Sequence, residues 1–243
     1  KTQFVHVASV AMMDYLFFKI HTRLNYVMAE IRLFWVADAT DRSRRTKLAM
    51  AVRYGVIGCG MMGQEHLRNI ALLPGATVTS IFEPNDEMAA ASLAMVPGAR
   101  RAESISAVVT ASDVDCLFIA SPNFRHAEQL REIAALRDIP VLLEKPACTN
   151  LDDVASLAAL ARDYKAPIWV AMEYRYMPPV ARLIDTIHES GELGHATMFS
   201  IREHRFPFLV KVDDWNRFNQ YSGGTLVEKC CHFFDLMRVM TRS

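Results

Sequence analysis

The sequence predicts an α/β fold, in which a doubly wound parallel sheet is followed by an incomplete α+β second domain. Two observations carry this prediction. From residue 52 onward, short β-rich runs alternate with helical segments, and the runs are apolar on both faces, as in parallel strands covered by helices on each side. After about residue 173 this alternation stops, and too few elements remain to bury a second sheet.

The elements of the first part follow from apolar periodicity and from turn residues. Strands are predicted at 54–57, 77–82, 115–120, 141–143 and 168–171. Helices are predicted between them, at 64–73, 86–95, 127–136 and 151–164. Asn150 is expected to begin the last of these helices, because acidic residues fill its first turn. In the second part, we expect a helix over 178–190 ended by Gly191, a strand over 195–204, an aromatic and charged loop over 206–221, and a helix over 225–240.

Composition excludes several classes of protein. The 27 basic side chains are balanced by 27 acidic ones, and the sequence has no stripe of basic residues. Both features argue against a nucleic-acid-binding protein, because such proteins carry a basic surface. No uncharged run reaches the roughly 18 residues that a membrane helix needs, and residues 1–49 lack the pattern of a signal peptide. The five cysteines have no zinc-ligand spacing, which favours reduced thiols in a cytoplasmic protein. We predict no metal, since Cys230, Cys231 and His232 are neighbours that cannot all point at one ion.

A glycine-rich turn follows the first predicted strand. Gly58 permits a tight turn, Gly60 lets a pyrophosphate approach the backbone, and Gly63 lets the next helix lie close to the strand. The N-terminal N–H groups of that helix would face the anion, so Met61 and Met62 are expected to contact a dinucleotide. Three glycines alone are also compatible with a plain tight turn.

An acidic residue ends the second predicted strand. Glu83 lies 20 residues after Gly63, where a carboxylate can accept hydrogen bonds from the adenosine ribose hydroxyls. Because a carboxylate repels a 2′-phosphate, NAD is favoured over NADP. The alternative is a solvated acid at the end of a strand.

Polar residues follow three further strands, and the carboxyl ends of parallel strands share one edge of a sheet. Ser121, Asn123 and His126 follow one strand, and Glu144 and Lys145 follow the next. A lysine directly after a buried strand needs a partner, and a lowered pKa would let Lys145 polarise a substrate oxygen. The alternative is a surface lysine paired with Glu144.

The predicted helix over 225–240 carries a second group of titratable residues. Glu228 and His232 are spaced i, i+4, so a helix would place them on one face, where the carboxylate raises the basicity of the imidazole. Asp235 could support His232 from behind. The alternative is a surface pair, although Gly223 and Gly224 before the helix favour a close approach by another segment.

Together these motifs resemble the glucose–fructose oxidoreductase/inositol dehydrogenase/MocA family. The resemblance rests on G-V-I-G-C-G-M-M-G, S-P-N-x-x-H, E-K-P and G-G-T-L-x-E-x-x-x-H-x-x-D, and it covers the chain from Met50 to its end. It implies a Rossmann domain, and a second domain that carries the substrate site and often an oligomer interface. The nearest subgroup is the inositol 2-dehydrogenase-like proteins, and family members continue beyond the position of Ser243, which suggests a truncated chain.

The resemblance also implies roles for single residues. Lys145 matches the catalytic lysine, with a cis peptide before Pro146, and His232 matches the catalytic base. Glu228 falls where inositol dehydrogenases carry an aspartate, and Arg175 matches a basic position at the domain junction.

The sequence therefore predicts an NAD-dependent oxidoreductase that moves a hydride between a nicotinamide and a secondary alcohol of a sugar or cyclitol. Lys145, Glu228 and His232 would be catalytic, with Asn123, His126 and Glu144 on the nicotinamide side. Substrate hydroxyls are expected to meet Arg175, Lys211, Trp215 and Arg217. The alternatives are an NAD-using glycoside hydrolase of the same family and a non-catalytic NAD-binding module.

This prediction divides the chain into three parts. Residues 1–49 would be an extension outside the enzyme fold, 50–172 the dinucleotide-binding domain, and 173–243 the start of the substrate and oligomerisation domain. We expect a homo-oligomer that has no membrane or nucleic-acid partner.

Overall fold

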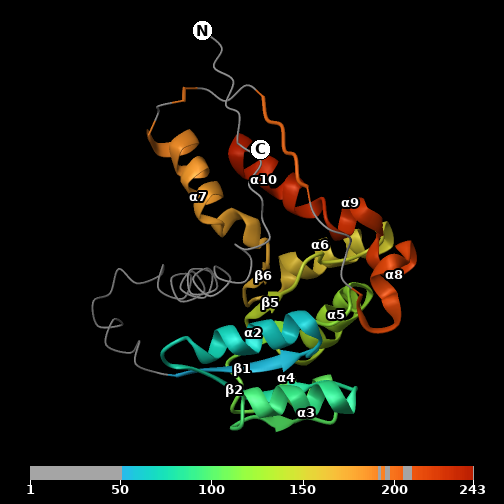
Figure 1. Ribbon diagram of the computed structural model, residues 1–243. Helices are drawn as coiled ribbons and strands as arrows, with labels where there is room; N and C mark the ends of the chain where they lie inside the picture. Colours follow the sequence, from blue (N-terminus) through green and yellow to red (C-terminus); the bar gives the residue numbers. More distant parts are fainter. Residues whose placement is uncertain (1–50, 191–192, 195–197, 205–209, 243) are drawn as a thin grey trace.

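A parallel β-sheet forms the centre of the computed structural model, which describes residues 51–190, 193–194, 198–204 and 210–242 (Figure 1). Its strands are β1 (Val52–Ile57), β2 (Ala76–Phe82), β3 (Arg100–Arg101), β4 (Cys116–Ile119), β5 (Val141–Leu143) and β6 (Ile168–Val170). They are ordered β3-β2-β1-β4-β5-β6, and every pair is parallel. The order reverses beside β1, as in a doubly wound sheet, so the predicted fold class is confirmed.

Helices connect these strands. They are α2 (Met61–Ala71), α3 (Asp86–Met95), α4 (Ile105–Val109), the 3₁₀ turn η2 (Asn123–Arg125), α5 (His126–Leu136) and α6 (Leu151–Asp163). Asn150 caps α6, because its side chain accepts the N–H of Asp153 at 2.9 Å, as predicted. The sequence prediction missed β3 and α4, which have two and five residues and are too short for periodicity to reveal.

The sheet is buried on both faces because its side chains alternate between two cores. Val56 and Phe118 face the side covered by α2 and α3, whereas their neighbours Ile57 and Leu117 face the side covered by α4, α5 and α6. These side chains are at most 1% exposed, so each strand contributes apolar surface to both cores. This explains why the strands are apolar throughout rather than alternating in polarity.

The last residues of the strands lie in register. Ile57 is opposite Phe82 on one side and Ile119 on the other, Ile119 is opposite Leu143, and Leu143 is opposite Val170. The segments that follow β1, β2, β4, β5 and β6 therefore leave the sheet at one edge.

Short helices follow β6. They are η3 (Glu173–Tyr176), α7 (Pro178–Asp185), a π-helical turn η4 (Thr186–Ser190), η5 (Val212–Arg217), α8 (Asn219–Ser222), α9 (Gly224–Glu228) and α10 (Cys231–Thr241). The π-helical turn packs on α10, where His188 Nε2 lies 2.8 Å from the carbonyl oxygen of Val239 (Figure 1). The glycine pair does permit a close approach: a Cβ on Gly223 would lie 2.9 Å from the carbonyl oxygen of Thr149.

Three predictions for this part are wrong. The described portion of the predicted loop over 206–221 contains η5 and α8. The predicted strand over 195–204 is absent from its described portion, 198–204, which has no regular structure. The predicted helix over 225–240 is broken between α9 and α10, at Lys229 and Cys230. The predicted extension over 1–49 and Gly191 lie outside the described residues, and the division into three parts stays a prediction.

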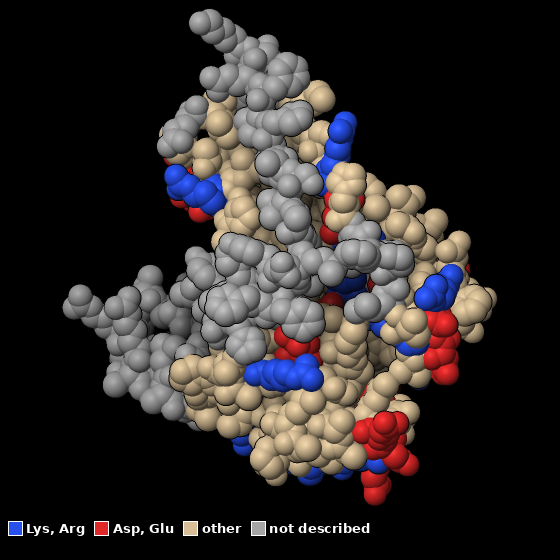
Figure 2. Space-filling view, in the orientation of Figure 1, with Lys and Arg blue, Asp and Glu red and all other residues tan. Residues whose placement is uncertain are grey.

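The surface and the helices agree with the charge balance of the sequence. Basic and acidic side chains are interspersed on the face shown in Figure 2. Across the described residues, none of the helices has the length and hydropathy required to cross a membrane. All five cysteines are free thiols, as predicted.

We predict that Gly58→Ala destabilises the fold, whereas Gly98→Ala does not. Gly58 has φ +86°, and a Cβ there would lie 2.5 Å from the backbone nitrogen of Ser121. The loss in unfolding free energy should be about 2 kcal/mol or more. At Gly98 no described atom lies within 4 Å of the Cβ position, so the change should stay within about 0.5 kcal/mol. Urea unfolding followed by circular dichroism measures both, and equal midpoints would contradict this account of the turn.

Candidate active site

The glycine turn between β1 and α2 has one open position. A Cβ on Gly63 would lie 2.3 Å from the carbonyl oxygen of Gly58, so these two glycines are required by the protein's own packing. Gly60 differs, because its backbone is extended (φ −66°, ψ −164°) and no described atom lies within 4 Å of its Cβ position. Any residue could adopt that backbone conformation.

Glu83 faces the same turn from the end of β2. Its carboxylate accepts the N–H of Cys59 at 2.7 Å and the N–H of Asn85 at 2.9 Å, and the residue is 8% exposed. Each oxygen keeps a second lone pair that could accept a ligand hydroxyl. Met61 and Met62, at the start of α2, have exposed side chains beside this turn.

Three polar residues follow β4, and they serve different purposes. Asn123 donates its side-chain N–H to the Glu228 carboxylate. Ser121 donates to the side chain of Gln129 at 2.5 Å. The ring of His126 is fully buried, with Nδ1 2.7 Å from the carbonyl oxygen of Pro146 and Nε2 3.0 Å from that of Ser121. His126 therefore joins two loops at the sheet edge, and its predicted place on the nicotinamide side stays a prediction.

Glu144, at the end of β5, pairs with a histidine that the sequence reasoning missed. Its Oε1 lies 2.8 Å from Nε2 of His66 on α2, and its Oε2 accepts the backbone N–H of Lys145 at 3.1 Å. Burial alone would raise the pKa of Glu144, but the hydrogen bond to His66 and the charge of Lys145 hold it below its ordinary value. The sequence did contain a signal for this pair, because His66 lies on the apolar side of a helix that packs on a strand. A histidine in that position becomes buried and needs a buried hydrogen-bond partner.

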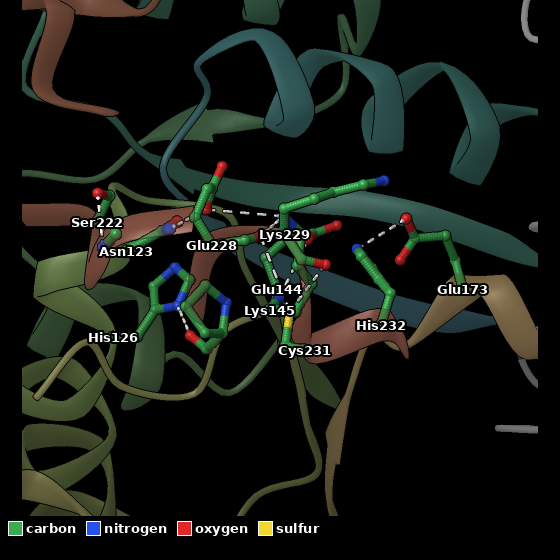
Figure 3. Close-up of polar contacts among 12 residues, drawn as sticks. Asn123, His126, Glu144, Lys145, Glu173, Ser222, Glu228, Lys229, Cys231 and His232 are labelled. Atoms are coloured by element: carbon green, nitrogen blue, oxygen red, sulfur yellow. Dashed lines mark hydrogen bonds and ion pairs between the residues drawn. The ribbon is translucent and has the colours of Figure 1, made fainter. Parts of the chain in front are cut away.

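Lys145 pairs with Glu228, and not with its neighbour Glu144 (Figure 3). Its Nζ lies 3.1 Å from the main-chain carbonyl oxygen of Glu228 and 3.8 Å from the Glu228 carboxylate. In a continuous helix that carbonyl would accept the N–H of His232, four residues on. Because the helix is broken here, the His232 N–H donates instead to the carbonyl oxygen of Lys229, at 3.3 Å. The Glu228 carbonyl oxygen can therefore accept a hydrogen bond from Lys145. The Lys145–Pro146 peptide bond is cis, as the resemblance implied.

The prediction that Lys145 has a lowered pKa is wrong. Burial does lower it, but the charges of Glu228, Glu144 and Glu173 outweigh burial, and the pKa of Lys145 is raised. Lys145 is therefore a cation at neutral pH, and it can donate hydrogen bonds and stabilise negative charge.

His232 is buried beside Glu173, and not beside Glu228 as predicted. Its Nε2 lies 3.6 Å from Oε1 of Glu173, and its ring stacks on Tyr174 with centroids 4.2 Å apart and an interplanar angle of 10°. The predicted i, i+4 pair fails because the helix is broken between the two residues. The predicted support from Asp235 is also wrong, since that carboxylate binds both Nε and a terminal nitrogen of Arg175.

A second buried lysine was missed as well. Lys229 Nζ lies 2.9 Å from Oε1 of Glu203 and contacts the hydroxyl of Tyr174. The Tyr174 hydroxyl also donates to Glu203, at 3.0 Å. This cluster fixes the tyrosine ring that lies against His232. The sequence could not predict this cluster, because its three residues come from segments that lie far apart along the chain.

The predicted substrate residues lie in different surroundings. Lys211 lies over the ring of Trp215 at 5.7 Å, and its pKa is lowered, mainly by burial and further by the charge of Lys145. These two residues are therefore close to the charges at the sheet edge. Arg217 is exposed and pairs with Asp214 at 2.9 Å, and Arg175 is engaged by Asp235.

Comparison with known proteins decides the family. A profile described as "Oxidoreductase family, NAD-binding Rossmann fold" matches residues 52–172, and one described as "Oxidoreductase family, C-terminal alpha/beta domain" matches residues 188–240. Both belong to the glucose–fructose oxidoreductase/inositol dehydrogenase/MocA family. The chain is a member of this family.

Members of this oxidoreductase family with curated names resemble the chain over most of its length. It is 29% identical over 196 residues to the rhizopine catabolism protein MocA of Rhizobium meliloti, covering 78% of this chain and 57% of that protein. It is 32% identical over 193 residues to inositol 2-dehydrogenase of Corynebacterium glutamicum strain R, covering 78% and 54%. The chain thus spans about half the length of the curated relatives it matches.

Solved structures of the family share the fold. A putative myo-inositol dehydrogenase from Sinorhizobium meliloti 1021 superposes with a TM-score of 0.65 at 22% identity, over 79% of this chain and 56% of that one. Myo-inositol dehydrogenase from Lactobacillus casei, in complex with NAD(H) and myo-inositol, superposes with a TM-score of 0.55 at 25% identity, over 60% and 43%.

The open position at Gly60 fits the dinucleotide that this oxidoreductase family binds. Among the residues that the structure describes, no group requires a glycine there, whereas a pyrophosphate lying on the start of α2 would need the space that a Cβ fills. The residues present therefore suit an NAD-type cofactor.

We predict that Gly60→Ala weakens cofactor binding without destabilising the protein. The added methyl group meets no described protein atom, so the unfolding free energy should change by no more than about 0.5 kcal/mol. The Kd for NADH, measured by the quenching of tryptophan fluorescence, should rise about tenfold or more. An unchanged Kd would contradict a pyrophosphate at this turn, and Gly98→Ala serves as the matched control.

Proposed function

We propose that the chain is the cofactor-binding and catalytic part of an NAD-dependent oxidoreductase that acts on a secondary alcohol of a sugar or cyclitol. The observation that supports this most strongly is the position of Lys145 at the sheet edge, where its Nζ lies 3.1 Å from the carbonyl oxygen and 3.8 Å from the carboxylate of Glu228, which favour its charged form. The names of similar proteins support the substrate class, since one is an inositol 2-dehydrogenase and another was solved with NAD(H) and myo-inositol.

The cofactor would lie across the carboxyl edge of the sheet. Gly58, Gly60 and Gly63 would receive the pyrophosphate, and the Glu83 carboxylate would accept the adenosine ribose hydroxyls. Because Glu83 is a carboxylate, it would repel a 2′-phosphate, which favours NAD over NADP. Bound NAD⁺ supplies the acceptor for the hydride that leaves the alcohol carbon.

The catalytic roles go to groups with matching chemistry. His232 takes the proton of the substrate hydroxyl as the carbonyl bond forms. Lys145 donates a hydrogen bond to the oxygen and stabilises the negative charge that develops on it. Glu228 keeps Lys145 protonated and in place, because it offers Lys145 both a carbonyl and a carboxylate oxygen.

Residues of the loop before α8 would hold the rest of the substrate. Lys211 offers hydrogen-bond donors, and the ring of Trp215 beside it offers an apolar platform for a sugar face. Arg175 and Arg217 are already paired with carboxylates, so Lys211 and Trp215 are the stronger substrate contacts.

The test is a panel of inositols and aldoses, each with NAD⁺ and with NADP⁺, followed by absorbance of the reduced cofactor. We expect reduction of NAD⁺ in preference to NADP⁺ with at least one polyol. Lys145→Met should lower kcat by roughly 10²–10³-fold, and His232→Asn by a similar factor, because each removes a group that acts on the reacting oxygen. Release of an aglycone from glycosides without NADH would favour the hydrolase instead.

The controls separate loss of chemistry from loss of fold. Lys145→Arg keeps the charge among the three carboxylates, so it should preserve stability while disturbing the reaction. Lys145→Met removes the cation that faces these carboxylates and leaves the Glu228 carboxylate without its ammonium partner, so its thermal midpoint should also fall. NADH binding by both variants, with no turnover of any polyol by the wild-type chain, would contradict the proposed function and favour a binding module.

A further inference from the structure

We propose that Glu173, and not Glu228, is the positioning residue that pairs with His232 and stabilises its protonated ring. This inference rests on the proposed function, in which His232 accepts the hydroxyl proton. It reassigns the two carboxylates of the site: Glu228 serves Lys145, and Glu173 serves His232.

Glu228 is committed to the other side of the site. Its carboxylate accepts the amide N–H of Asn123 and lies 3.8 Å from the Lys145 ammonium, and its main-chain carbonyl accepts Lys145 as well. Figure 3 shows Glu228 and Asn123 together, while His232 and Glu173 face one another apart from them. The break between α9 and α10 produces this separation, since an unbroken helix would stack Glu228 and His232 on one face.

Glu173 has the geometry and chemistry for the second pair. It is the first residue of η3, just after β6, and its Oε1 lies 3.6 Å from Nε2 of His232. Its side chain is partly exposed, but Oε2 is buried and has no hydrogen-bond partner among the described residues. Burial, and after it the charge of Glu144, raises the pKa of Glu173 to about 7, so a cation beside it, such as a protonated His232 ring, would stabilise its carboxylate form.

The other polar groups near His232 are either uncharged or already paired with another residue, so Glu173 is its anionic partner. From η3, Tyr174 stacks flat on the ring and presents no charge. Lys229, in the turn before α10, is paired with Glu203. On α10 itself, Asp235 is paired with Arg175.

The pair would act in the proton step of the oxidation. The hydroxyl O–H bond would break and its proton would go to the His232 ring as the C=O bond forms, and bound NAD⁺ would be the acceptor for the hydride lost from the carbon. His232 is then a cation in a buried site, and the Glu173 carboxylate beside it lowers the free energy of that state. Removing the carboxylate should make the ring harder to protonate.

The experiment compares Glu173→Gln with Glu228→Gln and with Glu128→Gln, an exposed glutamate on α5 that serves as the matched control. The first readout is histidine NMR of the chain without cofactor, with the His232 signals assigned from His232→Asn. In Glu173→Gln, the titration midpoint of the His232 ring should fall by about one pH unit. In the other two variants it should move by less than about a third of that amount.

The second readout is the pH dependence of kcat. Protonated His232 cannot act as a base, so activity falls on the acid side, and this limb should move to lower pH by about one unit in Glu173→Gln. We expect kcat to fall roughly tenfold or more and KM to change little, whereas Glu228→Gln should leave the acid limb in place.

The outcomes distinguish this pairing from the proposed function. If the wild-type chain oxidises no polyol, the proposed function fails, and the NMR titration still decides the pairing. If the wild-type chain is active but Glu173→Gln matches Glu128→Gln in midpoint and acid limb, the pairing is wrong and the proposed function stands. A shift caused by Glu228→Gln alone would restore the pair expected from the sequence.

Discussion

The charge on Lys145 is the constraint around which the site is built. An ammonium that follows a buried strand loses most of its hydration, and this favours the neutral form. Here three carboxylates reverse that effect, with Glu228 contributing most, followed by Glu144 and Glu173. Each carboxylate must itself be held in place. His66 holds Glu144 and Asn123 holds Glu228, so two residues with no evident chemistry of their own become essential to the lysine.

The same constraint joins the sheet to the segment after β6. Strand ends in register deliver Lys145 and Asn123 to one edge, but their partner Glu228 comes from a helix far along the chain. Gly223 allows the segment carrying that helix to approach Thr149 closely, and the break after α9 frees the carbonyl that Lys145 binds. A helix that stayed intact would satisfy its own backbone and offer Lys145 only a carboxylate.

Sequence reasoning was strongest where local patterns decide structure. The strands and the helices between them were predicted closely, because apolar runs, turn residues and the Asn150 cap are local signals. The two-residue strand β3 and the five-residue helix α4 were missed because they are too short to show a period. The predicted strand over 195–204 failed in its described part, where mixed polarity alone did not specify a sheet partner.

The site shows the same division. The spacing of Gly58, Gly60 and Gly63 predicted a tight turn and a close approach of the following helix, because the motif is local. The partners of Lys145 and His232 could not be predicted, since they depend on a helix break set by contacts between distant segments. An i, i+4 spacing indicates one face only if the helix continues, and here a main-chain carbonyl bonded to a lysine replaced a helical hydrogen bond.

The most direct test of this account is the titration of Lys145 itself. In the chain labelled with ¹³C-lysine, the Cε signal of Lys145, assigned from Lys145→Arg, reports the protonation of the amine. The account predicts that this signal stays constant from pH 7 to beyond the ordinary lysine pKa of about 10.4, because the surrounding carboxylates raise the pKa of Lys145. A transition centred below about pH 9 would show that burial outweighs them, and would contradict the account.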